Sequence, residues 1–184
     1  VLGLRESADT QLLWPHDFAL NLEITVGQEL GLALVTRNPG SEPLVITQAL
    51  HTYFRVGDIH KVSVTGLEGR EYLDKARAAS DPRTTQSGAI SVGQEVDRIY
   101  LDVGTEQVIE DGGFNRRIRI NTIGNHTAVV WNPWAEGARS MVDLGDREYL
   151  EMVCVETTNA GQDRLALDPG AVHRLTAEVR VESI

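Results

Sequence analysis

The feature that most constrains the fold is a two-residue alternation of apolar and more polar side chains near the N-terminus. Because successive side chains of a β-strand point to opposite faces of a sheet, such alternation is typical of a strand with one face buried against a core. Asn38-Pro39-Gly40-Ser41 follows as a turn that closes a hairpin or an arch between strands. The alternating apolar positions are Phe18, Leu20, Leu22, Ile24 and Val26 and, after a turn at Gly27-Gln28, Leu30, Leu32 and Leu34.

Short apolar runs continue along the chain, each followed by turn residues. They lie at residues 62–64, 99–103, 118–120 and 128–131, with alternation again at 175–181, and a longer mixed run covers 43–55. Trp134 to Leu144 is the only stretch with a helical phase, and the small polar residues from Asp74 to Gln94 predict a long loop. Many short strands separated by Gly and Pro turns predict an all-β, antiparallel β-sandwich.

Chain length is compatible with one domain. The 184 residues suffice to bury a sizeable core, so we expect a single β-sandwich domain over residues 1–184. The sequence starts at Val1 without an initiator methionine, so we expect it to begin partway through a longer gene product.

Charge and cysteine content exclude several classes of partner. Lys and Arg total 17 against 27 Asp and Glu, and the basic residues do not cluster, which argues against nucleic acid and anionic membranes as partners. A single cysteine, Cys154, allows no disulfide within the chain and favours a cytoplasmic location. Cys154 lies between valines, which indicates a small buried hydrophobic residue. No apolar run reaches the roughly 18 to 20 residues of a membrane span.

Two titratable side chains stand at the end of apolar, strand-forming runs. His51 lies within Ala49-Leu50-His51-Thr52-Tyr53-Phe54, and Glu156 ends Glu151-Met152-Val153-Cys154-Val155-Glu156. A histidine and a carboxylate brought to one cleft would form an acid/base pair. On the residues alone, a hydrogen-bonded core histidine and a strand-terminal glutamate that meets solvent remain open as interpretations.

The other candidate groups are weaker. Asp97 opens a strand after the polar loop, where it either accepts hydrogen bonds from sugar hydroxyls or is an ordinary turn residue. No phosphate-binding glycine loop, zinc-ligand spacing or Gly-x-Ser-x-Gly motif occurs. The remaining histidines have surface or turn contexts: His16, His60, His126 and His173.

Taken together, a series of motifs resembles the hexose-6-phosphate 1-epimerase branch of the aldose 1-epimerase superfamily. They occur in the family's order over essentially the whole chain. The motifs are Ala-Leu-His-Thr-Tyr-Phe at 49–54, Gly-Asp-Ile at 57–59, Val-x-Gly-Leu-x-Gly at 64–69, Tyr-Leu-Asp-Lys at 72–75, Asp-Arg-Ile-Tyr at 97–100, Val-Trp-Asn-Pro-Trp at 130–134 and Met-Val-Cys-Val-Glu at 152–156.

The resemblance implies a galactose mutarotase-like β-sandwich (supersandwich) that acts on a hexose or hexose phosphate. It implies His51 and Glu156 as catalytic residues and Asp97 as a substrate-binding residue. Interconversion of α and β anomers would use Glu156 as base and His51 as acid, without metal or nucleotide cofactor. The family's N-terminal segment, with early strands and phosphate-binding arginines, has no counterpart in this sequence, which would leave the sandwich without its N-terminal strands.

Two alternatives remain open. In the first, the chain is a non-catalytic carbohydrate-binding β-sandwich in which Trp131 and Trp134 stack on a sugar. In the second, it is an inactive fragment of the epimerase, whose exposed sheet edges favour pairing with another chain.

Overall fold

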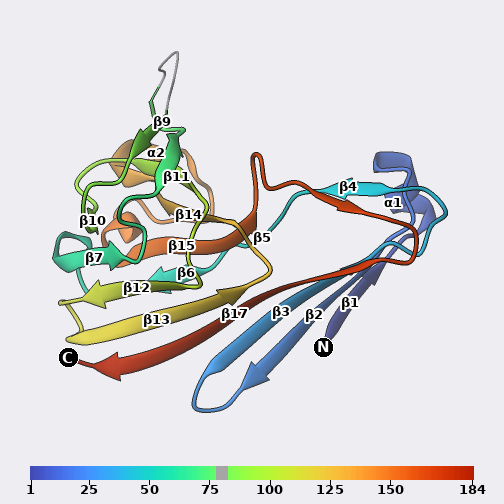
Figure 1. The fold of residues 1–184 in the computed structure, drawn as a ribbon. Helices are drawn as coiled ribbons and strands as arrows, with labels where there is room; N and C mark the ends of the chain where they lie inside the picture. Colours follow the sequence, from blue (N-terminus) through green and yellow to red (C-terminus); the bar gives the residue numbers. More distant parts are fainter. Residues whose placement is uncertain (78–82) are drawn as a thin grey trace.

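The protein is a sandwich of two antiparallel sheets, seen in a computed structural model that describes residues 1–77 and 83–184 (Figure 1). The eight-stranded large sheet has the order β1-β2-β3-β17-β13-β12-β7-β10. Its strands are β1 (Leu2–Arg5), β2 (Ala19–Val26), β3 (Leu30–Arg37), β17 (Val172–Ser183), β13 (Arg116–Ile123), β12 (Glu106–Asp111), β7 (Val62–Thr65) and β10 (Ile90–Ser91).

A smaller sheet packs on one part of the large sheet. It has the order β5-β15-β14-β11-β8-β9, and β6 also pairs with β15. Figure 1 shows β1, β2 and β3 extending away from this sheet, toward α1 (Ala8–Leu13). The strands of the small sheet are β5 (Gln48–Leu50), β6 (Tyr53–Arg55), β15 (Met152–Asn159), β14 (Thr127–Asn132), β11 (Val96–Leu101), β8 (Glu71–Asp74) and β9 (Arg83–Thr85).

The remaining elements are short. A two-stranded sheet joins β4 (Leu44–Ile46) to β16 (Leu165–Leu167) and buries Leu44 and Leu167 with Phe18. The others are α2 (Trp134–Ser140) and the 3-10 turns η1 (Ile59–Lys61) and η2 (Glu148–Glu151). Within the described residues, no helix is long and apolar enough to cross a membrane.

The core lies between the two sheets and uses one face of each. The large sheet contributes Val64, Ile109 and Leu175, and the small sheet contributes Tyr100 and Val153, all with no exposed surface. Since side chains alternate along each strand, the inward positions of the small sheet fix which of its residues point outward. The predicted all-β antiparallel sandwich is therefore confirmed, whereas the single-domain boundary at 1–184 stays a prediction.

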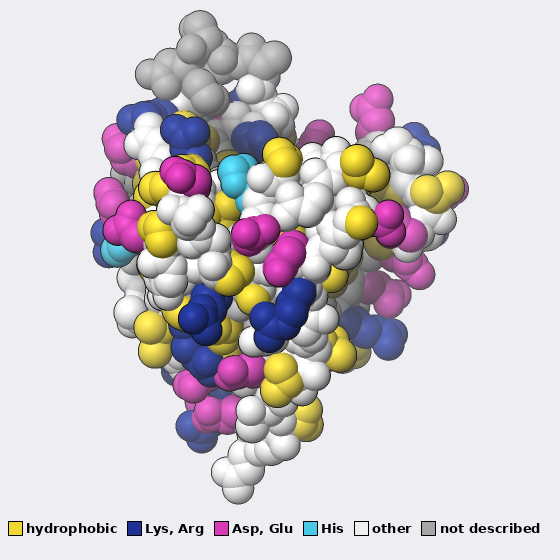
Figure 2. Space-filling view, turned by 90° about the vertical axis from the view of Figure 1, so that its right-hand side faces the viewer, with side chains coloured by type: hydrophobic (Ala, Val, Ile, Leu, Met, Phe, Trp, Pro, Cys, Tyr) yellow, Lys and Arg dark blue, Asp and Glu magenta, His cyan; other side chains and the backbone are white. Residues whose placement is uncertain are grey.

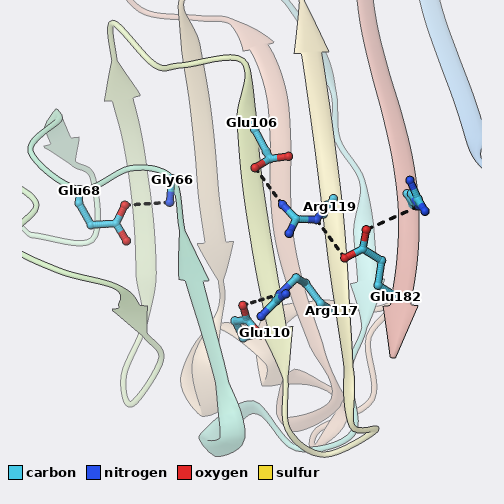
Figure 3. Close-up of polar contacts among 8 residues, drawn as sticks. Gly66, Glu68, Glu106, Glu110, Arg117, Arg119 and Glu182 are labelled. Atoms are coloured by element: carbon cyan, nitrogen blue, oxygen red, sulfur yellow. Dashed lines mark hydrogen bonds and ion pairs between the residues drawn. The ribbon is translucent and has the colours of Figure 1, made fainter. Parts of the chain in front are cut away.

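The outward face of the large sheet carries rows of paired charges (Figure 3). Arg119 lies between Glu106 and Glu182, with N–O distances of 3.0 Å to each, and Arg117 contacts Glu110 at 2.7 Å. Exposed ion pairs of this kind contribute little individually, and they are typical of a sheet face in contact with solvent.

Several local predictions were wrong. The stretch 74–94, predicted as one loop, contains β9 and β10, which pair with β8 and β7; Asp81 and Pro82 lie outside the described residues. The helix ends at Ser140 instead of Leu144, because Met141 is extended with φ −93° and ψ 128°. The run 43–55 is divided into three strands, β4, β5 and β6, that pair with two different elements.

Strand β12 was missed because its buried positions include polar residues. Gln107 is buried and donates a hydrogen bond to the Gly104 carbonyl at 3.0 Å. Asp111 is also buried, and its carboxylate pairs with Arg116 at 3.0 Å. Polar groups can lie inside a core when they are paired. The sequence of β12 therefore lacks an apolar alternation although it forms a strand.

A truncation in the centre of the sandwich should destabilise the fold. Ile109→Ala removes a fully buried side chain and should lower the free energy of unfolding by about 2 to 5 kcal/mol. The matched control is Ile123→Ala, whose side chain is 67% exposed. Urea denaturation would measure both variants, and equal midpoints would contradict the assignment of the core.

Candidate active site

The candidate site is the outward face of the small sheet, which we call the site floor. Strand pairing sets it out in two rows of opposed residues. The first row runs Lys75, Asp97, Trp131, Cys154, Tyr53, and the second runs Leu73, Ile99, Val129, Glu156, His51. Directly opposed residues of paired strands point to the same face, so these side chains share one surface.

His51 is positioned by the register of the edge strand. β5 pairs Leu50 with Thr157, and β6 pairs Tyr53 with Cys154, so two residues separate the pairs on each strand. The register is therefore continuous across the gap, and His51 stands opposite Glu156. In the gap the Thr52 N–H donates to the Leu50 carbonyl at 3.0 Å instead of to β15.

His51 and Glu156 are in direct contact. His51 Nε2 lies 3.3 Å from Glu156 Oε1, and the side chains are 48% and 6% exposed. The histidine can thus meet a ligand from solvent while its partner carboxyl lies beneath it. The sequence left open a core histidine and a solvent-facing glutamate, but the actual exposures are reversed.

Burial gives the Glu156 carboxyl an unusual protonation behaviour. Its pKa is raised from 4.5 to about 7, first by loss of hydration and then by the negative charge of Asp97, while the positive charge of Lys75 opposes the rise. A carboxyl with a pKa near 7 is present in both protonation states at neutral pH. This is the property expected of a group that takes up and returns a proton.

Asp97 lies on the same face, two strands from Glu156. It belongs to β11, and β14 separates it from β15. Its side chain is 26% exposed, and its Oδ2 lies 3.9 Å from Lys75 Nζ. The carboxylate is therefore accessible to a ligand on the site floor.

Aromatic rings cover one end of the site floor. The His51 ring stacks on Tyr53 at 4.9 Å, and Trp131 meets His51 and Tyr53 edge-on at 5.9 Å each. Trp134, which sequence reasoning grouped with Trp131, instead packs against the rings of His60 and Tyr149.

Sequence reasoning missed Tyr53 and Lys75 as parts of the site. Tyr53 could have been found from alternation, because it lies two residues after His51 and so on the same face. Lys75 required the β8–β11 pairing, which the predicted loop concealed.

Cys154 belongs to the first row of the site floor but has no exposed surface. Burial, and secondarily the Glu156 charge, raises the pKa of its thiol well above the ordinary value. The thiol therefore stays protonated, as expected of the small buried hydrophobe that its valine neighbours indicate.

The other histidines and potential metal ligands lie elsewhere. His16, His60 and His126 are exposed, and His173 is half-buried. Across residues 1–77 and 83–184, no group of three or more His, Cys, Asp or Glu side chains is arranged to hold a metal ion.

Comparison with known proteins identifies the family. The sequence profile of aldose 1-epimerase matches residues 1–180. The chain belongs to the aldose 1-epimerase family.

Two proteins that are similar to this chain come from Cenchrus ciliaris and Escherichia coli. A "putative glucose-6-phosphate 1-epimerase" of Cenchrus ciliaris is 38% identical over 173 residues, covering 92% of this chain and 52% of the relative. The protein of that name from Escherichia coli K12 is 36% identical over 178 residues, covering 97% and 58%. The chain thus spans a little over half the length of these relatives.

Solved structures agree on the fold. The crystal structure of a "putative mutarotase" from Salmonella typhimurium matches with a TM-score of 0.88 and 32% identity, over 99% of this chain and 59% of that one. A galactose mutarotase-like protein from Clostridium acetobutylicum matches with a TM-score of 0.70, at 14% identity, over 99% and 62%. The galactose mutarotase-like fold expected from the motifs is confirmed.

Glu156 should make stability depend on pH. Below about pH 4.5 the carboxyl is protonated in both folded and unfolded chains, and above about pH 7 it is ionised in both. In between, only the unfolded chain releases the proton. Stability therefore falls as pH rises, by about 3 kcal/mol in total.

Glu156→Gln, which does not titrate, should gain stability relative to the wild type between pH 5 and pH 8, as measured by urea unfolding at about those two values. Glu151→Gln, at a carboxylate that is 59% exposed, is the control and should show the same difference at both values. A difference for Glu156→Gln that does not change with pH would exclude a raised carboxyl pKa.

Proposed function

We propose that this chain carries the acid/base site of a hexose-6-phosphate mutarotase, an isomerase that interconverts the α and β anomers of glucose 6-phosphate or a related aldohexose phosphate. The observation that carries the proposal is the contact between an exposed His51 and a buried Glu156 on one sheet face. The names of the relatives, putative glucose-6-phosphate 1-epimerases, support the sugar phosphate as substrate.

In the proposed reaction the sugar lies over the site floor with its anomeric carbon at the His51–Glu156 pair. Glu156 accepts the proton of the C1 hydroxyl, while protonated His51 donates to the ring oxygen. The C1–O5 bond breaks, its electron pair stays on O5, and an aldehyde forms. Rotation about C1–C2 and ring closure with the proton transfers reversed give the other anomer.

The other groups on the site floor would bind and orient the sugar. Asp97 can accept hydrogen bonds from ring hydroxyls, because its carboxylate is partly exposed. Trp131 and Tyr53 supply aromatic surface beside His51. Each proton transfer by a positioned side chain typically contributes about 10²- to 10⁴-fold to the rate.

Loss of either group should therefore remove most of the activity. His51→Asn and Glu156→Gln should each lower the rate of anomer exchange by at least about 10²-fold. NMR exchange between the anomers of glucose 6-phosphate and of glucose, measured in parallel, checks this and identifies the substrate. His126→Asn, at an exposed histidine, is the matched control.

The same experiment decides between the proposal and its alternatives. Wild-type-like rates in either variant would contradict the acid/base assignment. If the wild-type chain perturbs sugar resonances without accelerating exchange, it is a carbohydrate-binding β-sandwich that uses the aromatic surface near Trp131. If it neither binds nor accelerates, the chain is an inactive part of a longer epimerase.

We also propose a cytoplasmic location and self-association through a sheet edge. β1 ends the large sheet, and its Leu2 and Leu4 side chains are 63% and 53% exposed. Figure 2 views the molecule from the right-hand side of Figure 1. It shows hydrophobic side chains interspersed with charged ones over this face. An unpaired strand edge with apolar side chains favours pairing with another chain.

A charge on this edge should weaken the association. Sedimentation velocity over a range of protein concentrations should show assembly of the wild type, reduced in Leu4→Lys. Leu12→Lys, at an 85% exposed position in α1, controls for added charge. A wild type that stays monomeric at every concentration would refute the proposal.

A further inference from the structure

Lys75 contacts Asp97, its neighbour in the first row of the site floor, through both its main chain and its side chain. It follows β8 directly and stands opposite Asp97 of β11. Its N–H donates to the Asp97 carbonyl at 2.8 Å, and its Nζ lies 3.9 Å from Asp97 Oδ2. The side chain is 59% exposed, so its ammonium stands at the solvent side of the first row.

Contacts on the opposite face of the small sheet hold this strand end in place. Asp74, which precedes Lys75, is buried, with Oδ2 lying 3.3 Å from Arg77 Nε and 3.9 Å from Arg98 Nε. The Arg98 guanidinium also lies over the Tyr72 ring, 4.7 Å from its centroid. The backbone of Lys75 is therefore fixed by a buried neighbour, although its own side chain is in solvent.

The groups that face Glu156 differ in charge. The edge strand presents His51 and Tyr53, β15 presents the protonated Cys154 thiol, β11 presents Asp97, and the end of β8 presents Lys75. Loss of hydration and the Asp97 carboxylate both favour the protonated, neutral Glu156, whereas Lys75 favours the ionised form. A base must be ionised to accept a proton, so Asp97 and Lys75 have opposite effects on it.

We propose that Lys75 is a positioning residue whose ammonium, paired with Asp97 on the site floor, compensates the charge of that carboxylate beside the base Glu156. The part played in catalysis rests on the proposed mutarotase function, whereas the charge compensation does not. Asp97 can then bind sugar hydroxyls beside the base while suppressing the ionisation of Glu156 less than it would without Lys75.

The direct test is the titration of Glu156 in the free protein. Carbon-13 NMR of the glutamate carboxyl groups, with the Glu156 signal assigned by its absence in Glu156→Gln, follows this titration without substrate. Lys75→Met keeps the length of the side chain and removes its charge. It should move the Glu156 titration to higher pH, Asp97→Asn should move it to lower pH, and Lys75→Arg should restore it.

Matched controls separate this effect from general charge. Lys61 forms a similar exposed ion pair with Asp58 at 3.7 Å, and its side chain is 65% exposed. Lys61→Met should leave the Glu156 titration unchanged. Because Lys75 is solvent-exposed, the shift in Lys75→Met should shrink at about 1 M salt, where charges are screened within a few ångströms.

Activity supplies a second measurement. The acid limb of the pH profile of kcat/KM for anomer exchange should move with the carboxyl titration in Lys75→Met. At about pH 6 this shift should lower kcat/KM on the order of two- to fivefold, and well above pH 8 kcat/KM should change little.

The two proposals fail in different ways. A shifted Glu156 titration in a chain that does not accelerate anomer exchange supports Lys75 and contradicts the mutarotase function. An unshifted titration overturns the inference on Lys75, even in an active enzyme. An unshifted titration with a higher KM for glucose 6-phosphate alone also overturns it and would make Lys75 a ligand of the phosphate.

Discussion

The edge strand formed by β5 and β6 keeps one register against β15 on both sides of His51, and this constraint sets the geometry of the site. Leu50 and Tyr53 are held opposite Thr157 and Cys154. The intervening histidine consequently faces Glu156 although its own stretch of backbone is not hydrogen-bonded to β15. The contact at 3.3 Å is thus a product of sheet pairing and needs no specialised loop.

Burial determines the proton affinity of Glu156, the second member of the pair. All eight residues of β15, which lies between the edge strand and β14, are buried. A carboxyl at this position loses hydration and binds its proton more tightly, at a cost in stability wherever it is ionised. Asp97 adds to this cost and Lys75 reduces it. Stability and proton affinity at Glu156 are therefore governed by the same few groups, so a change that improves one alters the other.

The sequence was sufficient to predict the fold class, because alternating apolar residues mark strands, and in β17 they also mark the buried positions Leu175, Ala177 and Val179. In β2 the expected burial of the alternating face was wrong toward the end of the strand, since Ile24 and Val26 are 44% and 81% exposed. The sequence also singled out His51, Glu156 and Asp97. It could not give their exposure, because the buried state of Glu156 depends on the strands that flank β15 on either side. The role of Lys75 could not be predicted for a related reason. Its neighbour Asp97 is distant in sequence, and only the β8–β11 pairing brings the two together. Strand β12 was hidden by Gln107 and Asp111, whose burial depends on partners that a periodicity does not reveal.

The two-row arrangement of the site floor also restricts how such a site can change over evolutionary time. Each side chain on it alternates with a core side chain on the same strand, as Glu156 does with Val155. A substitution on the site floor leaves the alternation of core and surface positions along its strand unchanged. A single inserted or deleted residue within β11, β14 or β15 would instead exchange the roles of core and surface along the rest of that strand. Length variation among descendants of this chain should therefore accumulate in the connections between strands, while the strands that carry the site diverge by replacement alone.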